Sequence, residues 1–229
     1  MFAFRETAAL DPDPRSGSRV EVAFTDASLD LREGDRLAAD LAALAAAAGV
    51  PFARLNQVHG ADVVEVSGPR AELPTADGQV TAARGVGLMV RVADCVPVVL
   101  ADAAAGVVGV AHAGRRGVEL DVVTRTVERM RDLGAADVTA WIGPHICGRC
   151  YEVPATMREE VAAAVPTTYA DTSWGTPALD LGAGVTAQLA ASGVVVTEVL
   201  GCTLEDPRFH SHRRDGAAAG RFAGLVWLS

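Results

Sequence analysis

The chain has 229 residues, half of them hydrophobic, and a formal net charge of −9. This length fits one large domain, and the acidic balance argues against binding to polynucleotides, which needs a clustered basic surface. All twenty basic residues are arginine, which excludes catalysis through a lysine Schiff base. Any phosphate recognition must therefore use guanidinium groups or backbone amides.

The sequence also predicts a cytoplasmic protein that does not enter a membrane. It has no run of about 18 apolar residues, and its first residues are charged too early for a secretory signal. In a reducing compartment we expect the four cysteines to be metal ligands, catalytic groups or core residues rather than disulfides. These are Cys95, Cys147, Cys150 and Cys202.

The first half of the chain predicts a leader, a strand, a helix and then several strands. Residues 1–18 are expected to form a leader rich in turns, because Pro, Asp, Gly and Ser are concentrated there. A strand is expected at residues 20–24 and a helix at residues 35–48, where leucines recur at helical spacing. From residue 53 to residue 110, short β-branched runs predict strands, several of them buried on both faces.

The second half alternates between helical and strand-like patterns. Apolar stripes predict helices at residues 118–133, 154–165 and 179–191. Strands are expected at residues 138–142, 194–196 and 221–228, with a polar loop around residues 213–216. Since no domain boundary is visible, we predict a single α+β catalytic domain over residues 19–229, with mixed β-sheets covered by helices in layers.

Three segments place a metal-ligating side chain at the end of an expected strand, beside Gly or Pro. They carry His59, Cys95 and His112. Two imidazoles and one thiolate leave a fourth tetrahedral position on Zn²⁺ open, as in catalytic zinc sites. The ligands are far apart in sequence, so spacing alone also allows Cys95 to be a buried apolar residue and the histidines to be hydrogen-bonded turn residues.

Ordered sequence blocks extend from residue 56 to residue 221. They are Asn56–Gly60, Ala93–Pro97, Ala111–Gly117, Ile142–Pro144, Cys150–Val153, Ser211–Gly216 and Gly220–Arg221. In these blocks the chain resembles the laccase-domain purine nucleoside phosphorylases, also called YfiH-like or polyphenol oxidase-like proteins. The resemblance implies a layered fold and a zinc ion bound by His59, Cys95 and His112.

The resemblance further implies phosphorolysis of adenosine, inosine, guanosine and methylthioadenosine, together with deamination of adenosine. We expect small nucleosides and phosphate as partners, no nucleic acid or membrane, and a monomer or small homo-oligomer. The chain departs from the family at Arg115, where the family usually has Trp. Losing the indole puts stacking on the purine in doubt, although a guanidinium group can also stack.

The proposed catalytic residues are Cys95, His112 and Asp94, which directly precedes Cys95. Deamination needs a proton carrier, and Asp94 is the candidate. Neighbours on a strand point to opposite faces, so a turn or bulge must bring its side chain to the same cavity. The alternative is a solvated or capping aspartate.

Phosphorolysis needs a phosphate site, which bidentate guanidinium groups suit. Arg116, Arg213 and Arg214 are the predicted substrate-binding residues. The alternative for each is pairing with a surface carboxylate.

The segment from His145 to Cys150 contains a Cys-x-x-Cys sequence, which can bind zinc or form a redox pair. No second Cys-x-x-Cys is present, and the nearby glycines predict a loop. We therefore expect loop residues that line the cavity, with His145 as an acid or ligand, Cys150 near the site and Cys202 in the core.

Three other interpretations remain open. A cysteine hydrolase, such as an amidase acting on cell-wall precursors, could use Cys95 as nucleophile and His112 as base. A copper-dependent polyphenol oxidase is a second alternative, because two histidines and a cysteine resemble blue-copper ligands, but no axial partner is evident. The third is a binding protein stabilised by a fully ligated metal.

Overall fold

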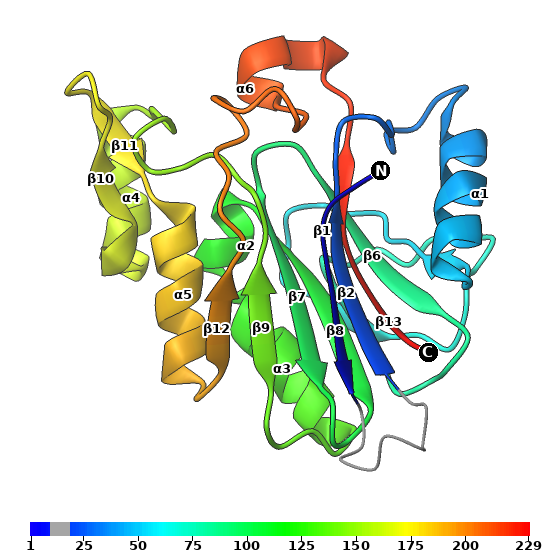
Figure 1. Ribbon diagram of the computed structural model, residues 1–229. Helices are drawn as coiled ribbons and strands as arrows, with labels where there is room; N and C mark the ends of the chain where they lie inside the picture. Colours follow the sequence, from blue (N-terminus) through cyan, green and yellow to red (C-terminus); the bar gives the residue numbers. More distant parts are fainter. Residues whose placement is uncertain (10–18) are drawn as a thin grey trace.

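The computed structural model describes residues 1–9 and 19–229. Two β-sheets pack face to face, and helices cover the outer face of each sheet (Figure 1). This four-layer arrangement confirms the predicted α+β class. Within the described residues, no helix is long and apolar enough to cross a membrane.

The first sheet has five strands, in the order β1-β2-β13-β6-β3. Neighbouring strands are antiparallel, except that β3 runs parallel to β6. The strands are β1 (Phe2–Ala9), β2 (Arg19–Thr25), β13 (Phe222–Leu228), β6 (Gly87–Val92) and β3 (Phe52–Ala53).

The second sheet has six strands, in the order β12-β9-β7-β8-β5-β4. Its outer pairs, β12 with β9 and β4 with β5, are parallel, and the inner pairs are antiparallel. The strands are β12 (Val195–Glu198), β9 (Thr139–Ile142), β7 (Val96–Asp102), β8 (Val107–Ala113), β5 (Gly78–Thr81) and β4 (Val63–Glu65). A separate hairpin pairs β10 (Tyr169–Asp171) with β11 (Pro177–Leu179).

The hydrophobic core has three main parts, one between the two sheets and one between each sheet and the helices that cover it. Phe24 and Val90 of the first sheet meet Val99 and Val110 of the second between the sheets. Every residue of β7 and β8 is buried, which confirms the prediction of strands buried on both faces.

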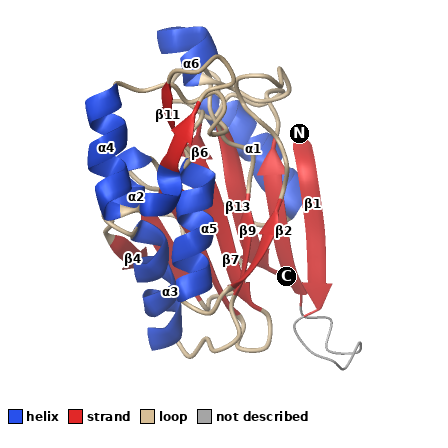
Figure 2. Ribbon diagram, turned by 90° about the vertical axis from the view of Figure 1, so that its left-hand side faces the viewer, coloured by secondary structure: helices blue, strands red, loops and turns tan. Residues whose placement is uncertain are grey.

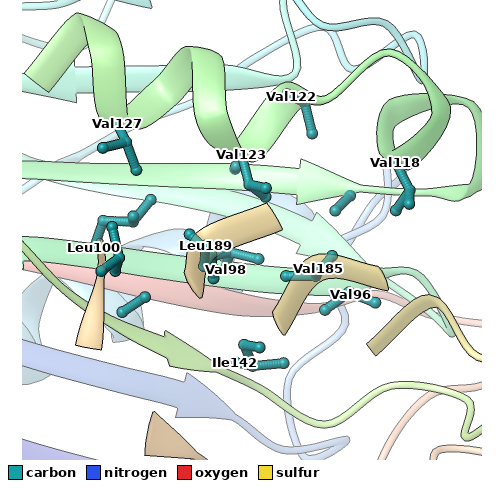
Figure 3. Close-up of a cluster of buried hydrophobic side chains, with 14 of the residues drawn as sticks. Val96, Val98, Leu100, Val118, Val122, Val123, Val127, Ile142, Val185 and Leu189 are labelled. Carbon is teal, nitrogen blue, oxygen red and sulfur yellow. The ribbon is translucent and has the colours of Figure 1, made fainter. Parts of the chain in front are cut away.

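Helices α2 (Arg115–Glu119), α3 (Val122–Asp132) and α5 (Leu181–Ala191) lie on the outer face of the six-stranded sheet (Figure 2). Figure 3 shows Val98 and Leu100 of β7 facing side chains of α3 and α5. Helix α4 (Ala155–Ala164) packs beside them, and α1 (Leu37–Ala48) covers the five-stranded sheet. Two short 3-10 helices lie at Pro166–Thr168 and Gly216–Ala218.

The predicted leader is wrong for its first part. Phe2–Ala9 form strand β1, which pairs with β2 along its length. The turn-rich residues 10–18 lie outside the described part of the chain.

The predicted helix at residues 118–133 is interrupted. Asp121 has a positive φ of 60°, which ends α2, and its carboxylate accepts a hydrogen bond from Thr124 N at 3.3 Å, which caps α3. Leu120, which directly precedes this break, is 43% exposed.

Other segments also differ from the prediction. The helix expected at residues 179–191 begins at Leu181, because Leu179 pairs in β11 and Asp180 caps the helix through Ala183 N at 2.9 Å. The loop expected around residues 213–216 contains a short helix, α6 (His212–Asp215). Figure 1 shows α6 above the upper ends of the strands.

Candidate active site

His59, Cys95 and His112 meet at one end of the two sheets, with ligand atoms all within 4.8 Å of one another. His112 lies near the end of β8 and Cys95 immediately precedes β7, and the antiparallel pairing of these strands places Val96 opposite Ala113. His59 comes from the loop between β3 and β4. Within residues 1–9 and 19–229, no fourth His, Cys, Asp or Glu joins this group.

Left-handed backbone conformations shape two of the three segments. Residues 93–95 carry the chain from β6 in one sheet to β7 in the other, and Asp94 has a φ of 87° at this crossing. His59 has a φ of 59°. Such conformations cost free energy in non-glycine residues and concentrate at functional sites. The turn between β6 and β7 that positions Cys95 therefore depends on the left-handed conformation of Asp94.

Asp77, which no sequence pattern marked, holds two of these side chains in position. Its side chain is fully buried just before β5, and its Oδ1 is 2.7 Å from His112 Nδ1. The same carboxylate accepts hydrogen bonds from the backbone N–H groups of Val58, His59 and Gly60, at 3.1, 3.0 and 2.6 Å. One buried carboxylate therefore fixes both the His112 ring and the loop that carries His59.

The charges of the group are mutually stabilising. Burial alone would raise the pKa of Cys95, but the charge and hydrogen bonds of His112 and His59 lower this pKa to about 6. Burial alone would lower the pKa of His112, but Cys95 and Asp77 raise this pKa to about 9. At neutral pH the metal-free pair is thus a thiolate beside an imidazolium.

Gly114 is required by the close approach of the backbone to these side chains. A Cβ atom at this position would lie 2.6 Å from His59 Cδ2 and 3.1 Å from Cys95 Sγ. Any larger residue would push the two side chains apart.

The donor set fits a zinc ion. Because His112 Nδ1 donates a hydrogen bond to Asp77 Oδ1, Nε2 is left as the ligand atom, and this carboxylate–histidine arrangement is typical of metal sites. Cys95 Sγ and His59 Nε2 are 3.9 Å apart, close to the roughly 3.6 Å that separates a sulfur and a nitrogen ligand on tetrahedral zinc.

The group forms part of the wall of a cavity of about 720 Å³. Six arginines also line the cavity: Arg32, Arg91, Arg115, Arg116, Arg213 and Arg221. Arg115 pairs with Glu119 at 3.1 Å, whereas the Arg116 side chain is exposed and has no hydrogen bond or ion pair with the described residues. An anionic substrate in this cavity would therefore meet one guanidinium group that is free to bind it.

Of the other two predicted substrate-binding residues, one lines the cavity and the other does not. Arg213 lines it, with its guanidinium carbon 5.1 Å from the centre of the Tyr151 ring. Arg214 lies outside the lining and donates to the carbonyl oxygens of Thr203 and Phe209, at 2.8 Å each. Arg214 thus stabilises the loop that contains Thr203 and Phe209 rather than facing the cavity. Only the tertiary structure distinguishes it from Arg213.

Asp94 lines the cavity, but both of its oxygens are engaged. Oδ1 accepts a hydrogen bond from Thr203 Oγ1 and Oδ2 accepts one from Arg213 N, each at 2.6 Å. Asp94 therefore anchors two segments of the cavity wall, and its role as proton carrier stays a prediction.

Two residues of the segment from His145 to Cys150 do not have the positions that were predicted for them. His145 and Cys150 do not line the cavity, whereas their neighbours Ile146 and Tyr151 do. His145 Nδ1 donates to Gly143 O at 2.8 Å. Cys202 is half-buried rather than part of the core. His212, at the start of α6, also lines the cavity, and no sequence pattern singled it out.

Residues 14–229 match the family described as multi-copper polyphenol oxidoreductase laccase. The chain belongs to this family. It is 56% identical over 180 residues to a Streptomyces griseus protein named purine nucleoside phosphorylase ORF3, covering 76% of this chain and 73% of that protein. It is 49% identical over 199 residues to a Mycobacterium tuberculosis protein named purine nucleoside phosphorylase, covering 84% and 79%.

Solved structures of this family share the fold. A crystal structure of a Neisseria meningitidis protein of the DUF152 family matches with a TM-score of 0.82 and 28% identity, covering 98% of this chain and 99% of that chain. The crystal structure of YlmD from Geobacillus stearothermophilus matches with a TM-score of 0.77 and 29% identity, covering 94% and 93%. The four-layer architecture is thus that of the family.

Proposed function

We propose that this chain is a zinc-dependent purine nucleoside phosphorylase that cleaves adenosine, inosine, guanosine and methylthioadenosine and also deaminates adenosine. The observation that carries the proposal is the meeting of His59, Cys95 and His112 in the wall of a cavity lined by arginines. Relatives named purine nucleoside phosphorylase support the choice of substrate.

His59, Cys95 and His112 would hold the ion. Bound there, zinc would act as a Lewis acid on water or substrate. Asp77 keeps the His112 ring oriented for this purpose and holds the His59 loop in its left-handed turn. Copper remains the alternative suggested by the family's description, and identification of the bound metal separates the two.

In phosphorolysis a phosphate oxygen bonds to the ribose C1′ as the bond from C1′ to the purine nitrogen breaks, and the departing base takes up a proton. Arg116 lines the cavity, and its side chain has no partner among the described residues, so it would bind the phosphate. Burial and the charge of Cys95 raise the pKa of Tyr151, so its hydroxyl remains a hydrogen-bond donor at neutral pH. Tyr151 and Arg213 together offer an aromatic and guanidinium surface on which a purine can stack.

Chromatography of adenosine and inosine incubated with the purified protein tests this function. Phosphorolysis requires that free base and ribose 1-phosphate appear only when phosphate is present, and deamination requires inosine from adenosine without phosphate. His59→Ala should abolish both reactions, whereas Arg116→Ala should impair only the phosphate-dependent one. Turnover that is the same in His59→Ala as in the wild type would contradict the proposal.

A second candidate, a cysteine hydrolase, is favoured by one observation. Asp77, His112 and Cys95 form a continuous chain of carboxylate, imidazole and thiol, as in hydrolases with a cysteine nucleophile. Iodoacetamide labelling of Cys95 distinguishes the two functions. A resident zinc ion should protect the thiolate until a chelator removes the metal, whereas a hydrolase would be labelled and inactivated as purified.

A further inference from the structure

A second group of metal-ligating side chains lies outside the cavity. The ligand atoms of Cys147, Cys150, Cys202 and Glu205 all lie within 4.8 Å of one another. In the sequence they form two pairs of equal spacing, Cys-Gly-Arg-Cys and Cys-Thr-Leu-Glu. A Cys-x-x-Cys sequence supplies only two of the four ligands of a zinc site. Here a Cys-x-x-Glu sequence from the C-terminal part of the chain supplies two more candidates.

Each pair is presented by a backbone turn. Cys147 O accepts hydrogen bonds from the N–H groups of Cys150 and Tyr151, at 2.9 and 3.0 Å. Cys202 O accepts hydrogen bonds from the N–H groups of Glu205 and Asp206, at 3.1 and 2.8 Å. Two ligands separated by two residues are the usual element of a structural zinc site.

Backbone pairing holds the two turns side by side. His145 N donates to Gly201 O at 3.1 Å, and Thr203 N donates to His145 O at 3.0 Å. The four ligand atoms are therefore brought together by a main-chain connection that does not itself depend on a metal.

We propose that Cys147, Cys150, Cys202 and Glu205 form a second, structural zinc site. Three thiolates and one carboxylate complete a tetrahedral sphere, and such a closed site stabilises structure rather than binding substrate. A disulfide would use only two of the three sulfurs. Cys150 is buried, Cys147 and Cys202 are half-buried, and Glu205 closes the group from the exposed side.

The site would tie together two segments of the cavity wall. Tyr151, which follows Cys150, lines the cavity, and Thr203, which follows Cys202, donates a hydrogen bond to Asp94. A metal between the two turns would keep both residues in place. The site is independent of the one proposed for catalysis, since the two share no residue.

Zinc content per chain, measured by mass spectrometry of metals after exhaustive dialysis, tests the proposal. We expect two zinc ions in the wild type, one in Cys202→Ser, one in Cys95→Ser and none in the double variant. If zinc binds at the second site but not at the proposed catalytic site, the wild type and Cys95→Ser will each hold one ion and Cys202→Ser none. Equal zinc content in the wild type and Cys202→Ser would overturn the second site.

Cobalt binding gives an answer even if Cys202→Ser does not fold. In Cys95→Ser all the remaining cysteines belong to the second group. Cobalt added to this variant should therefore produce the sulfur-to-metal charge-transfer bands of a tetrahedral site rich in thiolates, and the absence of such bands would overturn the proposal.

The fourth ligand has a test of its own. Glu205→Gln should weaken zinc binding, with Glu198→Gln, at an exposed glutamate, as the matched control. Equal zinc affinities for the two variants would contradict Glu205 as the fourth ligand.

Discussion

Asp77 Oδ1 lies 2.7 Å from His112 Nδ1, and the same carboxylate accepts the backbone N–H of His59. A single buried group thus orients one proposed ligand through its ring and another through its main chain. Despite burial, which would raise the pKa of Asp77, hydrogen bonds from His112 and from Gly60 N lower that pKa. Asp77 is therefore ionised at neutral pH and complements the positive charge of the metal site.

Asp77→Asn should weaken zinc binding by about 10- to 100-fold, the usual cost of losing a carboxylate behind a histidine ligand. The amide nitrogen would face N–H groups that now donate to a carboxylate oxygen. Competition with a chromogenic chelator measures the affinity. Asp62→Asn, at an exposed aspartate nearby, is the control, and equal zinc affinity for both variants would contradict the assigned role.

Gly114→Ala should remove zinc binding at the catalytic site while leaving the chain folded. The added methyl group would collide with His59 and approach Cys95 Sγ, so the three ligands could no longer converge. Gly68→Ala is the matched control, because a Cβ atom there meets nothing within 4 Å. Retention of zinc at His59 and Cys95 in Gly114→Ala, detected as protection of Cys95 from iodoacetamide, would show that the close approach is not required.

Arg116→Ala should raise the KM for phosphate by about 10- to 100-fold, because a hydrogen bond to a charged group contributes about 1.5–3 kcal/mol. The KM for the nucleoside should change less. Arg125→Ala on α3, also exposed and outside the cavity lining, is expected to behave as the wild type. Initial rates at varied phosphate concentration decide the matter, and an unchanged KM would remove Arg116 from the phosphate site.

Asp102→Asn should destabilise the fold by about 1–3 kcal/mol at neutral pH. This buried carboxylate at the end of β7 accepts hydrogen bonds from Ala105 N, Ala136 N and Asp137 N, at 2.9, 2.7 and 2.9 Å. Urea unfolding measures the loss. Asp137→Asn, at an exposed neighbour, should have little effect.

The pH dependence of this loss follows from the pKa of Asp102. Burial would raise this pKa, but the backbone hydrogen bonds lower it below the ordinary value. The stabilisation is therefore fully present above the unfolded-state pKa of about 4 and is lost as pH falls through the folded-state pKa. The stability difference between the wild type and Asp102→Asn should shrink on acidification, and a difference that grows would contradict this account.

The sequence was informative where chemistry marks individual residues. His59, Cys95 and His112 stand beside Gly or Pro at strand ends, and the structure brings them together as expected. Asp77 carried no such signal, because an aspartate before a glycine at the start of a strand is also an ordinary turn residue.

Features that depend on long-range packing could not be predicted. Arg213 and Arg214 are adjacent, yet only the structure shows that Arg213 lines the cavity while backbone carbonyls engage Arg214. Glu205 became a candidate ligand only once the pairing at His145 placed it near Cys147. The break at Asp121 could not be predicted, because its left-handed backbone conformation interrupts an otherwise continuous helical pattern.

Inosine phosphorolysis during stepwise return of zinc to the metal-depleted chain tests the central claim most directly. The initial rate of hypoxanthine release in phosphate buffer should rise in proportion to the zinc that protects Cys95 from iodoacetamide, and His59→Ala should stay inactive throughout. Full phosphorolysis by the zinc-free chain, or by His59→Ala, would contradict the account.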